Sequence, residues 1–82
     1  MEEDVKVLFF GAAAAAAETR EVYVPANGVS LNELWSLVTD KYPALAPMRG
    51  TLAFAINGEY AGLDEVVSAG DDVAVMPPVS GG

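Results

Sequence analysis

The 82 residues suffice for one domain with a thin core, and a composition of 52% hydrophobic and 9% aromatic residues predicts a folded chain. Twelve acidic residues stand against four scattered basic ones, Lys6, Arg20, Lys41 and Arg49, and this net charge of −8 excludes nucleic-acid binding, which needs clustered cations. The lack of cysteine and histidine excludes disulfides, thiolate or imidazole metal sites and the usual general base.

Residues 1–4 are mostly acidic and lack the basic start of a signal peptide. No stretch reaches the roughly 18 unbroken apolar residues that a membrane span needs. We therefore expect a cytoplasmic protein that does not act at a membrane.

The first quarter of the chain predicts two strands around a short helix. Residues 5–10 are β-branched and aromatic, and their nearly continuous apolarity indicates a central strand. Gly11 and six alanines follow, which predicts a short helix or helical turn over residues 12–17. Residues 20–24 then alternate between polar and apolar and stop at Pro25, as a second strand paired with the first would.

One amphipathic helix is predicted at residues 30–41. Ser30 and Glu33 have capping-box spacing, and Pro43 ends the helical pattern. The apolar residues fall on one helical face: Leu31, Leu34, Trp35, Val38 and Tyr42.

The remaining strands are predicted at residues 52–56, 59–60 and 73–76. Asn57 and Gly58 form the strongest short turn signal, between the first two of these strands. One good helix among five strands predicts an α+β fold in which a mixed sheet packs on that helix.

The last six residues are predicted to form a tail that leaves the sheet, so that the domain spans residues 1–76 and the tail residues 77–82. Pro77 and Pro78 cannot donate ladder hydrogen bonds and favour an extended conformation. Gly81 and Gly82 have no Cβ, so they fit a channel too narrow for a side chain. The α-carboxylate is inert until it is activated, and an acyl-adenylate made from ATP is the obvious route. Another enzyme must bind that ATP, because the chain has no G-x-x-x-x-G-K loop.

Residues 70–82, Gly-Asp-Asp-Val-Ala-Val-Met-Pro-Pro-Val-Ser-Gly-Gly, resemble the C-terminal signature of the molybdopterin synthase small subunits, the MoaD-type sulfur carriers. Residues 6–10 resemble the first strand of that family, and residues 57–60 lie where it has an Asn-containing turn. The resemblance covers essentially the whole chain and implies a ubiquitin-like β-grasp fold.

The resemblance also implies a mechanism centred on Gly82, with Gly81 beside it. An adenylyltransferase similar to ubiquitin-activating enzymes uses ATP to adenylate Gly82, and a sulfur donor converts the adenylate to a thiocarboxylate. The chain itself binds no cofactor or metal. Its tail inserts into the large synthase subunit, in a heterotetramer of two small and two large subunits, and sulfur passes to cyclic pyranopterin monophosphate to build the dithiolene.

The family further suggests a docking surface on the sheet face away from the helix. Consecutive Phe9 and Phe10 must point to opposite faces, so one of them cannot join the core under the helix. Ordinary core packing is the alternative explanation for these aromatic residues. One departure from the family is the alanine run at residues 12–17, where a charged helix with an Arg-Glu pair is usual. The implied partner-binding residues are Phe10, Tyr60, Met76, Pro77, Pro78, Val79 and Ser80.

Other functions remain open at this point. A ubiquitin-like modifier would join the same Gly82 to lysines of target proteins, and a carrier for thiamine or another thiolated product would use the same ending. A non-catalytic interaction domain would not need Gly82 at all. A stand-alone enzyme is disfavoured, because the acidic pairs Asp64-Glu65 and Asp71-Asp72 fall in expected turns.

Overall fold

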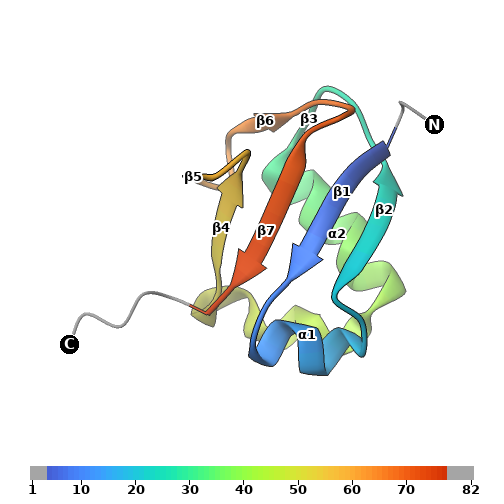
Figure 1. Cartoon of the computed structure of the whole chain (residues 1–82), viewed down its shortest axis with the longest axis vertical. Helices are drawn as coiled ribbons and strands as arrows, with labels where there is room; N and C mark the ends of the chain where they lie inside the picture. The colour runs from blue at the N-terminus through green and yellow to red at the C-terminus, as the bar shows by residue number, and fades with distance from the viewer. Residues whose placement is uncertain (1–3, 78–82) are drawn as a thin grey trace.

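The computed structural model describes residues 4–77, and its centre is a five-stranded mixed sheet (Figure 1). The strand order is β2-β1-β7-β4-β5, with β1 and β7 parallel and the other neighbours antiparallel. Of the tail predicted at residues 77–82, all but Pro77 lies outside the described residues. The strands are β1 (Asp4–Phe9), β2 (Glu21–Pro25), β4 (Ala53–Ile56), β5 (Glu59–Tyr60) and β7 (Asp72–Met76).

Strand β1 has β2 on one side and β7 on the other, so the prediction of a central first strand is confirmed. Val5, Val7 and Phe9 are buried and point toward the core, while the residues between them face the other way. The two-residue period of the strand therefore gives the sheet an inner, apolar face.

Helix α2 (Leu31–Lys41) covers the inner face, as the periodicity predicts. Its capping box is formed: Ser30 Oγ accepts a hydrogen bond from the Glu33 amide at 3.1 Å, and Glu33 Oε1 accepts one from the Ser30 amide at 3.1 Å. Trp35 packs edge-to-face on Phe54 with 5.2 Å between ring centroids, a contact worth about 0.5–1.5 kcal/mol beyond burial.

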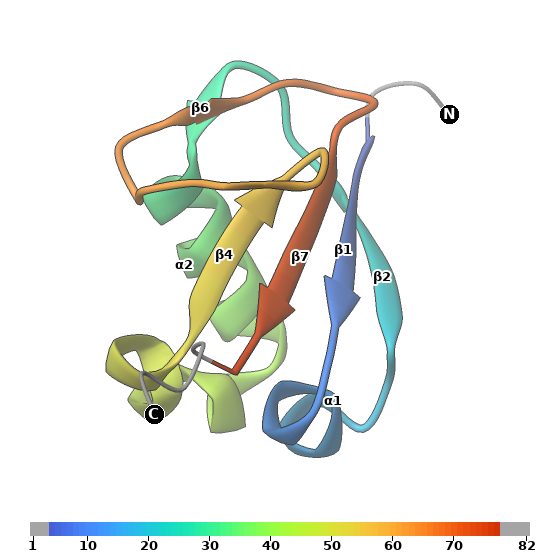
Figure 2. The same ribbon diagram turned by 60° about the vertical axis from the view of Figure 1, so that its left-hand side comes forward.

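Two short helical segments close the end of the sheet at which β1 and β7 finish (Figure 2). Helix α1 (Ala12–Ala17) forms from the alanine run and buries Ala13 and Ala17. The 3₁₀ helix η1 (Pro43–Thr51) was not expected from the sequence. Pro43 does end α2, but the chain then continues in the tighter 3₁₀ form and buries Leu45 completely.

A second, two-stranded sheet was also missed by the sequence analysis. Strands β3 (Val29–Ser30) and β6 (Val66–Val67) pair with Val29 opposite Val67, and Val67 is fully buried. This pair ties the loop before β7 to the start of α2.

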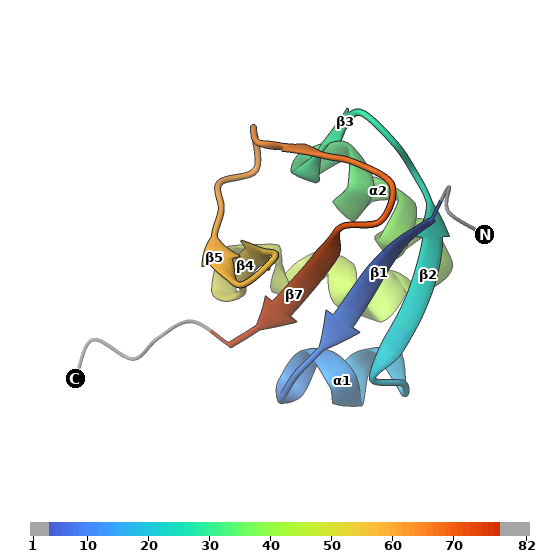
Figure 3. The ribbon, with the colours of Figure 1, turned by 45° about the horizontal axis from the view of Figure 1, so that its top comes forward.

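A mixed sheet wrapped on one main helix is the ubiquitin-like β-grasp arrangement, so the predicted fold class is confirmed. Figure 3 shows β1, β2 and β7 in front of α2, with their outer face turned away from that helix. Among the described residues, no helix is long and apolar enough to cross a membrane.

Candidate functional site

The outer face of the sheet, away from α2, carries an apolar patch at the end where β7 finishes. The pairing register fixes its members: Leu8 lies opposite Ala74, and Ala53 lies opposite Met76. Phe10 and Tyr60 extend the same face on either side by the two-residue alternation of their strands. We call these residues the outer-face patch: Leu8, Phe10, Ala53, Tyr60, Ala74 and Met76.

The two aromatic residues of the patch are unusually exposed. Phe10 is 48% exposed and Tyr60 65% exposed, whereas Phe9 is 2% exposed in the core. The expectation that Phe9 and Phe10 lie on opposite faces is therefore confirmed. Contiguous apolar surface on a domain this small is typical of a protein-binding site.

The patch adjoins the point at which the chain leaves the sheet. The Phe10 amide donates a hydrogen bond to the Val75 carbonyl at 2.9 Å, which continues the ladder between the two strands to their last residues. Gly11 follows with φ +58°, and a Cβ built on it would lie 2.8 Å from Cγ of Pro77. The bare backbone of Gly11 thus makes room for the first residue of the tail.

The structure brings the sequence-predicted site residues together only in part. Phe10 and Met76 lie on the neighbouring strand ends of β1 and β7, while Tyr60 lies on the edge strand β5, beyond β4. Pro77 is exposed beside Gly11. The other predicted residues lie outside the described ones: Pro78, Val79, Ser80, Gly81 and Gly82.

Sequence reasoning missed Leu8, Ala53 and Ala74. The signal for Leu8 was present, because a residue two positions before Phe10 in a strand shares its face. Ala53 and Ala74 could not be placed without knowing the register that joins β4 and β7.

Two arginines flank the outer-face patch. Arg20 lines a groove of ≈ 520 Å³ with Phe10 and Gly11, and Arg49 lines another of ≈ 400 Å³ with Ala53 and Tyr60. Half of the four cations of the chain therefore frame the apolar patch. Glu21 lines the first of these grooves beside Arg20, so the border of the patch carries charges of both signs.

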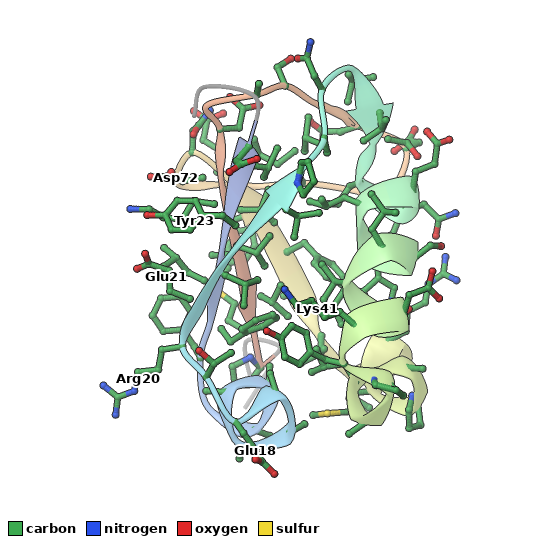
Figure 4. The ribbon with its side chains drawn as sticks, turned by 90° about the vertical axis from the view of Figure 1, so that its right-hand side faces the viewer. Glu18, Arg20, Glu21, Tyr23, Lys41 and Asp72 are labelled. Carbon is green, nitrogen blue, oxygen red and sulfur yellow. The ribbon has the colours of Figure 1, made fainter. Side chains whose placement is uncertain are left out.

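The opposite end of the outer face is polar (Figure 4). Lys6 lies between Tyr23 and Asp72 in the register of the sheet. Hydrogen bonding to the Glu21 carboxylate, with some burial and the negative charges of Glu21 and Asp72, raises the pKa of the Tyr23 hydroxyl, while Lys6 works against this shift. The outer face is thus divided into a charged end and an apolar end.

Of the two acidic pairs, Asp64 and Glu65 lie in a turn, as expected, whereas Asp72 is the first residue of β7 and only Asp71 precedes the strand. Glu65 Oε2 accepts a hydrogen bond from the Gly62 amide at 3.2 Å, and Asp71 Oδ2 accepts one from the Ser68 amide at 2.8 Å. Within residues 4–77, no polar side chain is buried and no group of three acidic side chains is placed to hold a metal ion.

Comparison with known proteins identifies what this geometry resembles. The sequence matches the ThiS family over residues 7–82. It is 36% identical over 83 residues to the human molybdopterin synthase sulfur carrier subunit, covering 95% of this chain and 93% of that protein. The structure is similar to SAMP1 from Haloferax volcanii, with a TM-score of 0.83, 30% identity and coverage of 96% and 99% of the two chains. A protein–protein complex of subunits 1 and 2 of the molybdopterin-converting factor from Helicobacter pylori gives a TM-score of 0.69, 30% identity and coverage of 96% and 99%.

Proposed function

The chain belongs to the ThiS family, and we propose that it is the sulfur-carrier subunit of a molybdopterin synthase. The observation that carries this proposal is the outer-face patch, which ends at Met76, immediately before the segment that leads to Gly82. Its closely similar relatives are named as that subunit, and the family match runs through residue 82. In this role the chain is a substrate-bearing subunit and does no catalysis on its own.

The proposed chemistry takes place at the carboxylate of Gly82. One carboxylate oxygen attacks the α-phosphate of ATP on the activating enzyme, and pyrophosphate leaves. Hydrosulfide released by a sulfur donor then attacks the acyl carbon, and AMP departs to leave the thiocarboxylate. Gly81 and Gly82 offer no Cβ that would hinder either attack.

In the second half of the proposed cycle the tail enters the large subunit. There the sulfur of the thiocarboxylate bonds to cyclic pyranopterin monophosphate, and water attacks the acyl carbon to break its bond to sulfur and restore the Gly82 carboxylate. Two such deliveries complete one dithiolene. The similarity to the Helicobacter pylori complex of subunits 1 and 2 supports a large-subunit partner. We propose a heterotetramer of two small and two large subunits, in the cytoplasm, where ATP and the activating enzyme meet the carrier.

The outer-face patch is the proposed contact with both partners. A surface that ends beside Pro77 holds the tail at a fixed distance from whatever covers Phe10 and Met76. Once the patch is bound, the tail enters the partner within the same complex, which raises the effective concentration of the tail at the partner's active site.

Protein modification is the second candidate function. It is favoured by the similarity to SAMP1 from Haloferax volcanii, a small archaeal modifier protein, whose TM-score of 0.83 exceeds the 0.69 of the Helicobacter pylori molybdopterin-converting factor. The same adenylate would then be attacked by a lysine amine to form an isopeptide. A carrier for another thiolation pathway would share every step up to the thiocarboxylate.

The test is thiol alkylation read by intact mass after incubation with ATP, an activating enzyme and a sulfur donor. Conversion to a thiocarboxylate adds about 16 Da, which methionine sulfoxide at Met48 or Met76 would also add. Alkylation separates the two, because the chain has no cysteine to label. The matched variants are a deletion of Gly82 and Gly50→Ala, a change at a glycine with open space around its Cβ position.

We expect ATP-dependent labelling that is lost when Gly82 is deleted and kept in Gly50→Ala. Labelling that persists without Gly82 would contradict the proposal. Unlabelled carrier together with ATP-dependent adducts on lysines of other proteins would establish the modifier function instead.

A further inference from the structure

Strands β1 and β7 run parallel and end side by side, and the residues that follow them meet (Figure 1). The register pairs Phe9 with Val75, and two positions further along it sets Gly11 beside Pro77. A Cβ at position 11 would come closer to the Pro77 ring than Cβ atoms come to their neighbours in known proteins. The Pro77 ring therefore packs against bare backbone, and we call these two residues the tail seat.

Gly11 is fixed in place by hydrogen bonds on both sides. The Phe10 amide before it donates to the Val75 carbonyl at 2.9 Å, and the Gly11 carbonyl accepts a hydrogen bond from the Ala15 amide at 3.2 Å. A side chain at position 11 could not move aside without breaking the end of the β1–β7 ladder or the first turn of α1. Pro77 is therefore the residue that would have to move.

Pro77 is tied to less of the fold than Gly11. It follows Met76, the last residue of β7, which lies opposite Ala53 in the sheet, and it has no amide to donate to a ladder. The Cγ and Cδ atoms of a proline are bonded back to its own main-chain nitrogen, so the ring cannot swing aside as a flexible side chain does. Any displacement of the ring therefore displaces the backbone at the base of the tail.

A displacement at Pro77 is passed on to the rest of the tail. Its ring fixes φ and the proline that follows restricts ψ, so neither angle is free to compensate. Five residues follow Pro77, and a fully extended segment of that length spans roughly 17 Å. A turn of roughly 10° at its base would shift the far end by roughly 3 Å. Misplacement of reacting atoms by about 1 Å can slow a reaction roughly a hundredfold.

The tail seat also joins the tail to the outer-face patch. Phe10 precedes Gly11, and Met76 precedes Pro77, so each strand end passes directly from a patch residue to a seat residue. The docking surface and the base of the tail are thus built on the same two strand ends. A partner that covers the patch meets the tail in the direction that the seat sets.

We propose that Gly11 is a positioning residue for the chemistry of the tail, and that it acts through Pro77. The tail seat sets the direction in which the tail leaves the sheet relative to the outer-face patch. Once the patch is docked, this direction decides whether the Gly82 carboxylate meets the α-phosphate of ATP. The inference rests on the proposed function, because it requires that Gly82 is adenylated on an activating enzyme.

The test uses the full chain as the substrate of its activating enzyme and follows adenylation by the exchange of labelled pyrophosphate into ATP. Docking through the patch contributes to KM for the carrier, whereas the position of the tail within the complex contributes to kcat. Gly11→Ala should lower kcat at least about tenfold and leave KM within about twofold. Phe10→Ser should instead raise KM, because it removes a docking contact.

Removal of the Pro77 ring separates positioning from a general loss of structure. In a Pro77→Ala background, Gly11→Ala should change kcat by less than about twofold, because the ring that it displaces is gone. Gly28→Ala is the matched control, since it adds the same methyl group at positive φ with open space around it, and both kinetic constants should stay unchanged. Each variant is assayed at a temperature at which its circular dichroism matches that of the wild type.

Unchanged kcat in Gly11→Ala, a rise in KM alone, or an equal loss of kcat with and without the Pro77 ring would overturn the inference. If Gly11→Ala does not fold, Pro77→Ala alone decides. It frees φ at the base of the tail and should lower kcat about three- to tenfold, and unchanged kcat would equally overturn the inference. Failure of the proposed function has a different signature, because the wild type itself would then support no carrier-dependent exchange.

Discussion

A Cβ on Gly11 would lie 2.8 Å from Cγ of Pro77 and 3.3 Å from its Cδ. The first residue after β1 and the first residue after β7 thus pack against each other without a side chain between them. Gly11 also has φ +58° and ψ −132°, a region that side-chain-bearing residues rarely adopt. The start of α1 and the base of the tail are therefore coupled at one glycine.

Gly11→Ala should lower the free energy of unfolding by about 2–3 kcal/mol, through backbone strain and the clash with Pro77 together. Gly28→Ala is the matched control, since Gly28 has φ +72° and open space around its Cβ position. Gly28→Ala should lower the free energy of unfolding by only about 1 kcal/mol, from backbone strain alone. Urea denaturation measures the free energy of unfolding of both variants. In the double variant Gly11→Ala/Pro77→Ala, the stability lost through the clash with the Pro77 ring should be recovered. Equal losses in the two single variants would show that the close approach to Pro77 costs nothing.

The capping box of α2 should contribute about 1 kcal/mol. Ser30→Ala removes the acceptor of the Glu33 amide, and Glu33→Ala removes the acceptor of the Ser30 amide. We expect the double variant to lose less stability than the two single losses added, because the two bonds support each other. Ser36→Ala is the control: its hydroxyl donates only to the Asn32 carbonyl within the helix, so the change should be neutral or slightly stabilising. Additive losses in thermal denaturation would contradict a cooperative cap.

Tyr23 should titrate above its ordinary value near 10, because Glu21 holds its proton. A raised folded-state pKa means that the folded chain keeps this proton longer than the unfolded chain does. The resulting stability is complete below the ordinary value and is lost as pH rises through the folded-state pKa. Tyrosinate absorbance, taken as the difference between the wild type and Tyr23→Phe, measures the titration. Glu21→Gln should return the pKa toward its ordinary value, and an unchanged titration in that variant would exclude Glu21 as the cause.

Asn57 joins two turns through its side chain. Its Nδ2 donates to Asp71 Oδ1 at 3.0 Å, and its Oδ1 accepts from the Asp72 amide at 2.9 Å. Asn57→Ala should cost about 1–2 kcal/mol at any pH, because both bonds are lost. Asn57→Asp keeps the acceptor but sets two carboxylates side by side.

The two Asn57 variants should therefore differ in their dependence on pH. The carboxylates at positions 57 and 71 of Asn57→Asp repel each other when both are charged, so the loss of stability in this variant should shrink as pH falls from about 7 to about 4. Urea denaturation of both variants at the two pH values measures this. A pH-independent deficit in Asn57→Asp would show that Asp71 is too far from position 57 to interact.

The sequence predicts well those elements that depend on residues close together in the chain. Ser30 and Glu33 are three residues apart, and Asn57 and Gly58 are adjacent, so α2 and the β4–β5 turn follow from short-range chemistry. The fold class follows from these elements and from the apolar run of β1. The resemblance of residues 70–82 then adds an identity for the tail that no local propensity could supply.

What it misses depends on contacts far apart in the chain. Val29 pairs with Val67, and neither residue belongs to a run long enough to indicate a strand. The outer-face patch needs the parallel register of β1 with β7, which sets Leu8 beside Ala74. The 3₁₀ helix was missed because Pro43 and Pro47 argue against a helix, although the shorter 3₁₀ turns accept them.

The last prediction concerns the outer-face patch as a docking surface. Phe10→Ser and Tyr60→Ser remove exposed rings, so the free energy of unfolding should change by less than about 1 kcal/mol. If the rings are buried by the large subunit, each loss should weaken that complex at least about tenfold, as truncation of an aromatic anchor does. Isothermal titration calorimetry against the large subunit measures the affinity.

Leu37→Ser is the matched control, because Leu37 is 44% exposed but lies on α2, away from the patch. Its affinity for the large subunit should equal that of the wild type. If Phe10→Ser and Tyr60→Ser behave like Leu37→Ser, the tail alone holds the complex together. The two rings would then be exposed for another reason, and removing residues 81–82 from the wild type should abolish binding outright.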